Sequence, residues 1–193
     1  MEKPKAELPV ILFEKPEEWI GWLKENHESE QGIWMRFAKK ASALESISYA
    51  EAMDGALCYG WIDGQVKKYD EDSWIQKFTP RRSRSLWSKI NTEKVARLIE
   101  SGLMQEAGLR EVERAQQDGR WEAAYDSPSK AEVPSDFAEE LEKNEKAKEF
   151  FATLNKQNRY AIIWRIQTAK KAETRAKRIG QLVEMLEKGE KIH

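Results

Sequence analysis

The chain has little cysteine and histidine for its length. Among 193 residues there is one cysteine, Cys58, and there are two histidines, His27 and His193. A single cysteine excludes an intrachain disulfide and a thiolate cluster for zinc or iron–sulfur binding. Two histidines leave little material for imidazole-ligated metal sites or histidine-centred acid–base chemistry, so we expect no metal and no cofactor. We interpret Cys58 as a small buried residue near the end of a helix.

Long hydrophobic runs are also missing. No segment approaches the roughly 20 apolar residues that span a bilayer, and the first residues lack an apolar stretch of signal-peptide length. We therefore expect a soluble, cytoplasmic protein. The chain is nevertheless rich in aromatic residues, with eight tryptophans, five tyrosines and six phenylalanines. This composition argues against disorder, and the length suffices for a substantial core.

The net charge is only −1, from 33 basic and 34 acidic residues. This balance excludes a general polycation that binds nucleic acid without specificity. Basic residues nevertheless gather in two stretches. Residues 81–97 contain six basic residues and one acidic residue, and residues 156–178 contain eight and one. Any charged function must therefore be local.

Hydrophobic periodicity predicts strands and helices mixed over the first 80 residues and helices alone after residue 85. Ser48 and Glu51 have the spacing of a capping box, and Gly64 permits a bulge in a hairpin. The predicted strands are 10–13, 33–37, 61–69 and 73–79. The predicted helices are 16–26, 49–59, 88–102, 104–117, 135–143, 145–154, 158–170 and 172–187, with Asn91 as an alternative start of the third. A Ser- and Pro-rich linker is predicted at 126–135.

These elements predict an α+β fold, with a small, mostly antiparallel sheet and helices in the N-terminal part and a helical bundle in the C-terminal part. We expect an α+β subdomain at 1–84 and connecting helices at 85–125 that pack on it. A C-terminal helical subdomain follows at 134–193.

The first basic stretch has the ingredients of an anion site. Arg81 and Arg82 leave a strand and precede a helix whose first N–H groups lack intrahelical partners. The alternative is a plain connection in which Ser88 caps the helix and the arginines pair with acidic residues of the N-terminal part. The candidate ligand-binding residues are Trp61, Asp63, Arg81, Arg82, Trp87, Ser88 and Asn91.

Asp63 follows two large apolar residues at the start of a strand and therefore needs a partner if it is buried. One interpretation is a structural ion pair with Lys39, Lys40, Arg81 or Arg82. The other is a pocket with aromatic walls and a polar floor, in which Asp63 is a weak candidate for a catalytic acid or base. The second basic stretch is either a solvated helix face or a contact for an acidic partner, a nucleic acid backbone or anionic lipid.

Six short segments occur in a fairly specific order and spacing. They are GWIDG at 60–64, FTPRR at 78–82, SLWSKIN at 85–91, DGRW at 118–121, VPSD at 133–136 and TRAKRI at 174–179. Together they resemble the bacterial YdeI/OmpD-associated family, also described as bacteriocin-protection proteins, from about residue 30 onward. The resemblance implies association with an outer-membrane porin and protection against cationic antimicrobial peptides. It implies no catalytic residues.

Three functions are consistent with these patterns. The first is a binding or stress-protection module with a pocket for a small anionic ligand or an acidic group of a protein partner. The second is an enzyme in which Asp63 acts as general acid or base on an anionic small molecule. The third is a nucleic-acid binder that uses both basic stretches, which the near-zero net charge makes unlikely. We favour the binding module over the enzyme, and leave open both whether a reaction is catalysed and the oligomeric state.

Overall fold

The computed structural model describes residues 7–193, which form two compact units. The first unit consists of residues up to Ser85 together with Asn91–Glu122. The second consists of Leu86–Ile90 and Ala123–His193. Each unit is considered by itself below.

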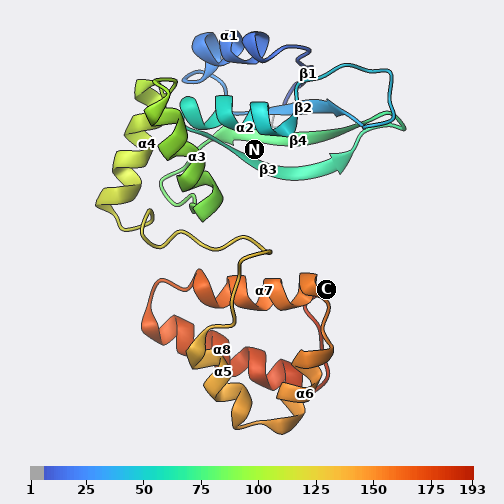
Figure 1. The fold of residues 1–193 in the computed structure, drawn as a ribbon, viewed down its shortest axis with the longest axis vertical. Helices are drawn as coiled ribbons and strands as arrows, with labels where there is room; N and C mark the ends of the chain where they lie inside the picture. The colour runs from blue at the N-terminus through green and yellow to red at the C-terminus, as the bar shows by residue number, and fades with distance from the viewer. Residues whose placement is uncertain (1–6) are drawn as a thin grey trace, which may run out of the picture. The chain divides into compact units, whose positions relative to one another are not determined.

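The first unit contains a four-stranded sheet in the order β1-β2-β4-β3 (Figure 1). The strands are β1 (Val10–Leu12), β2 (Ile33–Ala38), β3 (Trp61–Lys68) and β4 (Ser73–Pro80). β1 pairs with β2 in parallel, and the other two pairings are antiparallel. The pairing of β3 with β4 is irregular between Asp63 and Val66, which confirms the predicted bulge beside Gly64.

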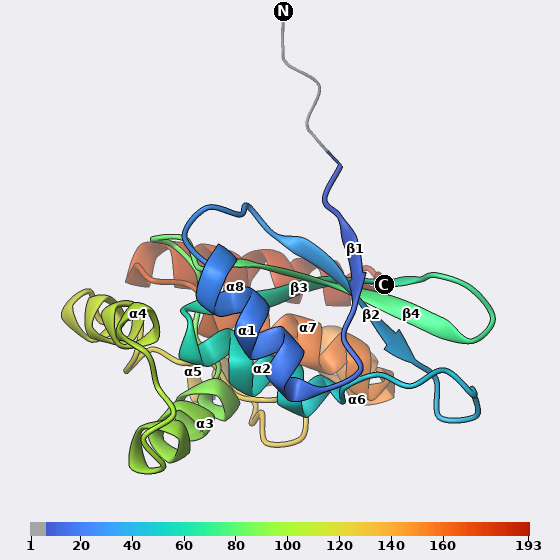
Figure 2. The same ribbon diagram turned by 90° about the horizontal axis from the view of Figure 1, so that it is seen from above.

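Two helices, α1 (Pro16–Asn26) and α2 (Tyr49–Cys58), cover one face of this sheet (Figures 1 and 2). Trp19 of α1 is the centre of the core, since its ring lies 6.2 Å from Trp61 and 5.9 Å from Phe78. Its indole N–H also donates to the Ala52 carbonyl of α2 over 3.0 Å. The opposite face of the sheet is more open, and there the Lys67 ammonium lies 4.4 Å from the Trp34 ring centre.

The capping box predicted at the start of α2 is present. The Glu51 amide donates to the Ser48 hydroxyl over 3.2 Å, and the Ser48 amide donates to the Glu51 carboxylate over 2.7 Å. The helix α4 (Glu106–Gln117) crosses close to the end of α2, because a Cβ built on Gly108 would lie 2.3 Å from the Cys58 carbonyl oxygen. The helix α3 (Lys89–Glu100) precedes α4 in the chain.

Four helices form the second unit: α5 (Ser135–Glu142), α6 (Glu145–Thr153), α7 (Lys156–Gln167) and α8 (Ala172–Glu187). They share one hydrophobic core, in which Phe137, Ile162, Ile166 and Leu186 are fully buried. Figure 1 shows the four helices folding back on one another over short connections. The unit therefore has a core of its own.

Side-chain hydrogen bonds fix the helix ends of the second unit. Asn144 and Asn155 accept from the backbone amides of Ala147 and Asn158, which caps α6 and α7. The buried amide oxygen of Asn158 also accepts from the His193 backbone amide over 3.0 Å. Polar side chains thus hold both helix starts and the end of the chain in place.

The predicted α+β class and mostly antiparallel sheet are confirmed. The observed elements lie within a few residues of their predicted positions, since α1 begins at Pro16 and α8 spans Ala172–Glu187 as expected. No helix in residues 7–193 has the length and apolar character needed to cross a membrane.

Candidate functional site

The predicted ligand-binding residues divide between the two units. Trp87 and Ser88 belong to the second unit, and the other five belong to the first. Trp61 and Trp87 are 1% and 2% exposed, so both rings are core residues rather than walls of an open pocket. The Trp61 indole N–H donates to the backbone carbonyl of His27 over 3.2 Å. Trp61 and Trp87 therefore both contribute to packing, and their role in ligand binding remains a prediction.

The arginines that follow β4 differ in their exposure. Arg81 is 6% exposed, and its backbone amide donates to the Gly60 carbonyl over 2.9 Å. Arg82 is exposed, and its amide donates to the Ser85 hydroxyl. Ser88 forms a β-bridge with Tyr125, and Asn91 lies half-buried in α3. A shared anion pocket for these residues remains a prediction.

Asp63 lies on β3 with neutral partners. Its Oδ2 atom accepts from the Tyr49 hydroxyl over 2.8 Å and from the Gln76 side-chain amide over 3.1 Å. In the part of the chain that the structure describes, no ion pair involves Asp63, so the expected pairing with a nearby lysine or arginine is wrong. Register explains the difference, because Asp63 lies opposite Phe78 rather than beside the arginines after β4.

Much of the first basic stretch is used inside its own unit. Lys94 and Arg97 of α3 both contact the Asp54 carboxylate of α2, over 3.4 and 2.6 Å. Lys89, at the start of α3, pairs with Asp126 over 2.7 Å within the second unit. These side chains connect elements within each unit. The capping role of Ser88 and the pairing of Arg81 and Arg82 with acidic residues remain predictions.

The second basic stretch is also partly structural. Arg175 of α8 holds Asp136 of α5 through two hydrogen bonds of 2.6 and 2.8 Å, and this pairing lowers the pKa of Asp136. Arg159 donates to the Phe151 and Ala152 carbonyls at the end of α6. Both arginines are therefore committed to the packing of the helices.

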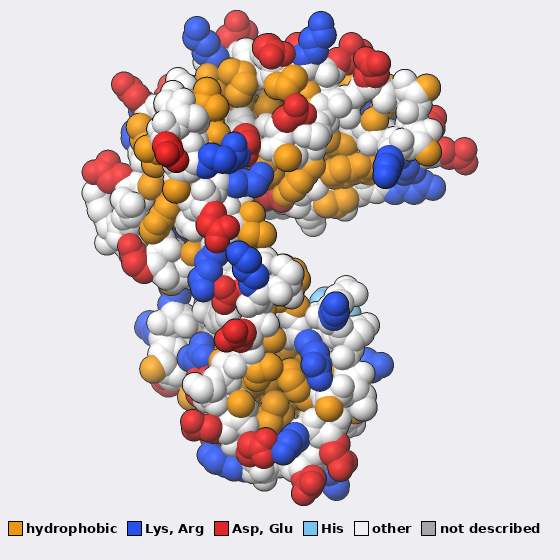
Figure 3. Space-filling model, viewed as in Figure 1, with side chains coloured by type: hydrophobic (Ala, Val, Ile, Leu, Met, Phe, Trp, Pro, Cys, Tyr) orange, Lys and Arg blue, Asp and Glu red, His pale blue; other side chains and the backbone are white. Residues whose placement is uncertain are grey.

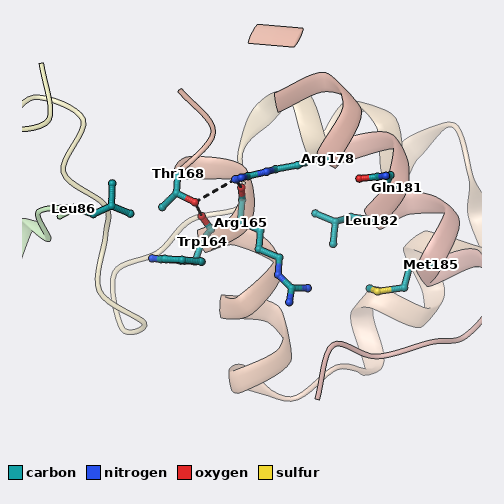
Figure 4. A pocket seen from close by; sticks show the side chains of 8 residues that line it. All are labelled: Leu86, Trp164, Arg165, Thr168, Arg178, Gln181, Leu182 and Met185. Atoms are coloured by element: carbon teal, nitrogen blue, oxygen red, sulfur yellow. Dashed lines mark hydrogen bonds between the residues drawn. The ribbon is translucent and has the colours of Figure 1, made fainter. Parts of the chain in front are cut away.

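A pocket of about 600 Å³ opens between α7 and α8 (Figure 4). Its size is in the range of small-molecule sites. Figure 4 shows the Arg165 side chain between Trp164 on one side and Leu182 and Met185 on the other. The lining residues are Leu86, Trp164, Arg165, Thr168, Arg178, Gln181, Leu182 and Met185.

Arg178 is fixed at the edge of this pocket. Its Nη1 atom donates to the Arg165 backbone carbonyl over 2.5 Å and lies 3.4 Å from the Thr168 hydroxyl, where it satisfies the C-terminal end of α7. Within residues 7–193, the hydrogen bonds of Arg178 all use Nη1, and the Arg165 guanidinium has no hydrogen bond or ion pair. No acidic residue lines the pocket. The pocket therefore carries two positive charges without a carboxylate to neutralise them.

Two further pockets differ from this one in their charged side chains. A pocket of about 600 Å³ beside α1 and α4 includes Arg110, but Glu28 and Glu106 lie within 3.3 and 4.0 Å of that guanidinium. His27 lines the same pocket and donates from Nδ1 to the Leu23 carbonyl. A pocket of about 640 Å³ beside the start of α7 is also lined by two basic residues, Lys156 and Arg159, without an acidic residue. It contains one guanidinium rather than two, and that group donates to two carbonyls at the end of α6.

Sequence reasoning identified the second basic stretch but did not single out the pocket. Arg165 and Arg178 are thirteen positions apart, and periodicity alone does not place one helix against the next. The usable signal was Trp164 beside Arg165, because an aromatic ring next to an exposed guanidinium is typical of binding sites. No group of His, Cys, Asp or Glu side chains suited to a metal ion occurs in the described residues.

Comparisons with known proteins connect the second unit with the resemblance found in the sequence. Residues 130–189 match the family described as Bacteriocin-protection, YdeI or OmpD-Associated, which confirms that relation. The segments 133–136 and 174–179 lie inside this match. The ion pair between Asp136 and Arg175 connects the two segments. The other four segments lie outside it.

No curated protein and no solved structure matches the chain. A second family match spans residues 11–111 and includes the sheet with α1, α2 and α3. Because this match covers more than half of the 193 residues, the chain belongs to the family described as Domain of unknown function (DUF8412).

Proposed function

We propose that the protein is a binding module that holds an amphipathic anion in the pocket between α7 and α8. The observation that carries this proposal is the pair of guanidinium groups, Arg165 and Arg178, on a pocket lining without acidic residues. A carboxylate or phosphate group would lie between these two side chains.

Arginine suits such a head group because its planar fork donates two parallel hydrogen bonds to a carboxylate or phosphate. Arg178 is already held by the end of α7, so binding would order only the Arg165 side chain. A site with one guanidinium fixed in advance loses less conformational entropy when the anion arrives.

The apolar part of the ligand would contact Trp164, Leu182 and Met185, which line the same pocket. An indole ring and a methionine thioether adapt to flat or flexible apolar groups. We therefore favour a ligand with an acidic head and a short hydrocarbon or aromatic body over a simple inorganic anion.

The test is a titration of the full chain with hexyl phosphate, followed by calorimetry and by the Trp164 indole N–H signal in ¹H–¹⁵N NMR spectra. We expect saturable binding that is tighter for hexyl phosphate than for inorganic phosphate. Replacement of Arg165 by Gln should weaken binding about tenfold, because it removes a charge-assisted hydrogen bond.

Lys177→Gln is the matched control, because it removes one positive charge from exposed α8 outside the pocket lining. This variant should bind hexyl phosphate within about twofold of the parent protein, since an exposed charge that does not line the pocket is largely screened by solvent and salt. Equal weakening by both substitutions would indicate a general charge effect, and no saturable binding of hexyl phosphate would reject the proposal.

The family match at residues 130–189 carries the description bacteriocin protection, and we include that process in the proposal. All lining residues except Leu86 lie in the matched segment. Bacterial cells that produce Arg165→Gln should then survive a bacteriocin less well than cells that produce Lys177→Gln at equal protein level. Equal survival of the two kinds of cells would show that anion binding in this pocket is not needed for protection.

A further inference from the structure

Asp63 is a carboxylate held in place by neutral groups. The Gln76 side chain that donates to it is 3% exposed and is itself fixed by a second hydrogen bond of 2.8 Å to the Gly64 carbonyl. The Tyr49 hydroxyl supplies the other hydrogen bond. Both donors bind Oδ2 and neither carries a charge, and within residues 7–193 no ion pair involves this half-buried carboxylate.

Aromatic and apolar side chains lie on the same face of the sheet. In the register of β3 and β4, Val66 lies opposite Gln76, and Trp74 is two positions before Gln76 on β4. The Trp74 ring stacks on Phe37 at 4.5 Å, and the Tyr49 ring meets the same Phe37 edge-on at 6.4 Å. A preoriented carboxylate therefore lies beside a short aromatic row.

This is the face that α1 and α2 cover, and it opens to solvent beyond the N-terminal end of α2. Tyr49 is 41% exposed and Val66 is 61% exposed. Figure 3 shows hydrophobic side chains gathered beside the N-terminal end of α2, over β3 and β4. We define the Asp63 surface as Tyr49, Asp63, Val66 and Trp74.

The side chains of the Asp63 surface favour a ligand with a positive charge at the end of an alkyl chain. A carboxylate with a free Oδ1 atom accepts hydrogen bonds from a guanidinium or ammonium group, and adjacent aromatic rings attract the same charge. The surface is too open to enclose a small molecule, which normally buries most of its area on binding. β3 is the edge strand of the sheet, so the main chain of an extended peptide has room beside it.

We propose that the Asp63 surface binds the cationic side chain of a polypeptide partner, with the charged group on Asp63 and its alkyl chain against Tyr49 and Trp74. This site is in the first unit and is independent of the anion pocket between α7 and α8. It uses the carboxylate that the sequence singled out, in a role that requires no catalysis.

The test uses the ¹⁵N-labelled full chain and two acetylated, amidated peptides, Gly-Arg-Gly and Gly-citrulline-Gly. Citrulline has nearly the shape of arginine without its charge. We expect the arginine peptide at millimolar concentration to shift the Trp74 indole and Gln76 side-chain amide signals in a saturable way. The citrulline peptide should leave these signals unchanged.

Substitutions provide the second arm. Asp63→Asn should weaken binding of the arginine peptide about tenfold, because a charge-assisted pair becomes a neutral one. Asp72→Asn removes the same charge from the exposed turn after β3 and should leave binding unchanged. Lys68, opposite Trp74 in the register, repels a cation, so Lys68→Gln should strengthen binding about twofold.

Three outcomes would overturn the proposal: equal shifts with both peptides, equal weakening by Asp63→Asn and Asp72→Asn, or no saturable shift of the two signals. Tyr49→Phe is the control for misfolding. It removes the hydrogen bond from Tyr49 to Asp63 but keeps the aromatic ring and the charge of Asp63. A folded Tyr49→Phe variant that still binds the arginine peptide, beside an Asp63→Asn variant that does not, supports the assignment.

Discussion

Cys58 illustrates how one residue acquires its chemistry from its surroundings. Its side chain is 4% exposed at the end of α2, where its backbone carbonyl accepts from Gln105. Burial raises the pKa of the thiol to about 11, and the nearby Asp54 charge adds to this effect. The environment therefore stabilises the neutral thiol, which agrees with the structural role predicted from the sequence.

The expected consequence is a slow reaction of Cys58 with iodoacetamide in the native protein. At pH 7 roughly one thiol in 10,000 is ionised when its pKa is about 11. Mass spectrometry should find little alkylation under native conditions and complete alkylation in concentrated urea. Rapid native alkylation would contradict the buried environment.

Glycines in two helices of the first unit should respond oppositely to alanine. A Cβ on Gly108 would overlap the Cys58 and Leu57 carbonyl oxygens, whereas a Cβ on Gly21 meets nothing within 4 Å. We expect Gly108→Ala to lower the free energy of unfolding by about 1–3 kcal/mol through overpacking. Gly21→Ala should raise it by up to about 1 kcal/mol, since alanine favours the helix. Urea denaturation measures both.

At the scale of elements, the pair of Asp136 and Arg175 connects α5 with α8. The hydrogen bonds from Arg175 are the main cause of the lowered pKa of Asp136, whose ordinary value is 3.8. A carboxyl group with a lowered pKa in the folded state stabilises the fold above its unfolded pKa. That contribution is lost as the pH falls through the folded value.

Asp136→Asn should therefore destabilise the protein most near neutral pH and progressively less below pH 3.8. The side chains are 30% and 44% exposed, so solvent screening limits the expected effect to about 1 kcal/mol at pH 7. Glu140→Gln, which breaks the exposed pair with Lys143, is the control and should change the free energy of unfolding much less. Urea denaturation at pH 7 and pH 3 distinguishes the two, and a pH-independent effect of Asp136→Asn would contradict the linkage.

Local sequence signals were sufficient to predict where the helices and strands lie. Ser48 of the capping box directly precedes α2, and the breaker Gly60 follows its C-cap residue, so periodicity and capping signals located that helix. The partners of Asp63 come from α2 and from across the sheet, and strand register is set by tertiary packing. The same limit hid Arg178, whose role at the end of α7 depends on how two helices meet.

For the whole molecule, the division into two units has an energetic meaning. The first unit has its core around Trp19 and the second around residues such as Phe137 and Ile162. We propose that each core unfolds as its own cooperative unit, as separate cores generally do. Local destabilisation should then remain within one unit.

Hydrogen exchange of the Gly108→Ala variant tests this proposal. We expect faster amide exchange in α2, α4 and the sheet, with exchange in α5–α8 unchanged within about twofold. The Asp136→Asn variant should produce the reverse pattern. Equal acceleration in both units by either substitution would show a single cooperative transition.

The scarcity of histidine has a practical consequence. One imidazole, His27, belongs to the first unit, and the other, His193, belongs to the second, where its backbone binds Asn158. Nδ1 of His27 donates to the Leu23 carbonyl, so the native fold fixes its tautomer. The proton NMR signals of these two imidazole rings thus report on the two units separately, without isotope labels or substitutions.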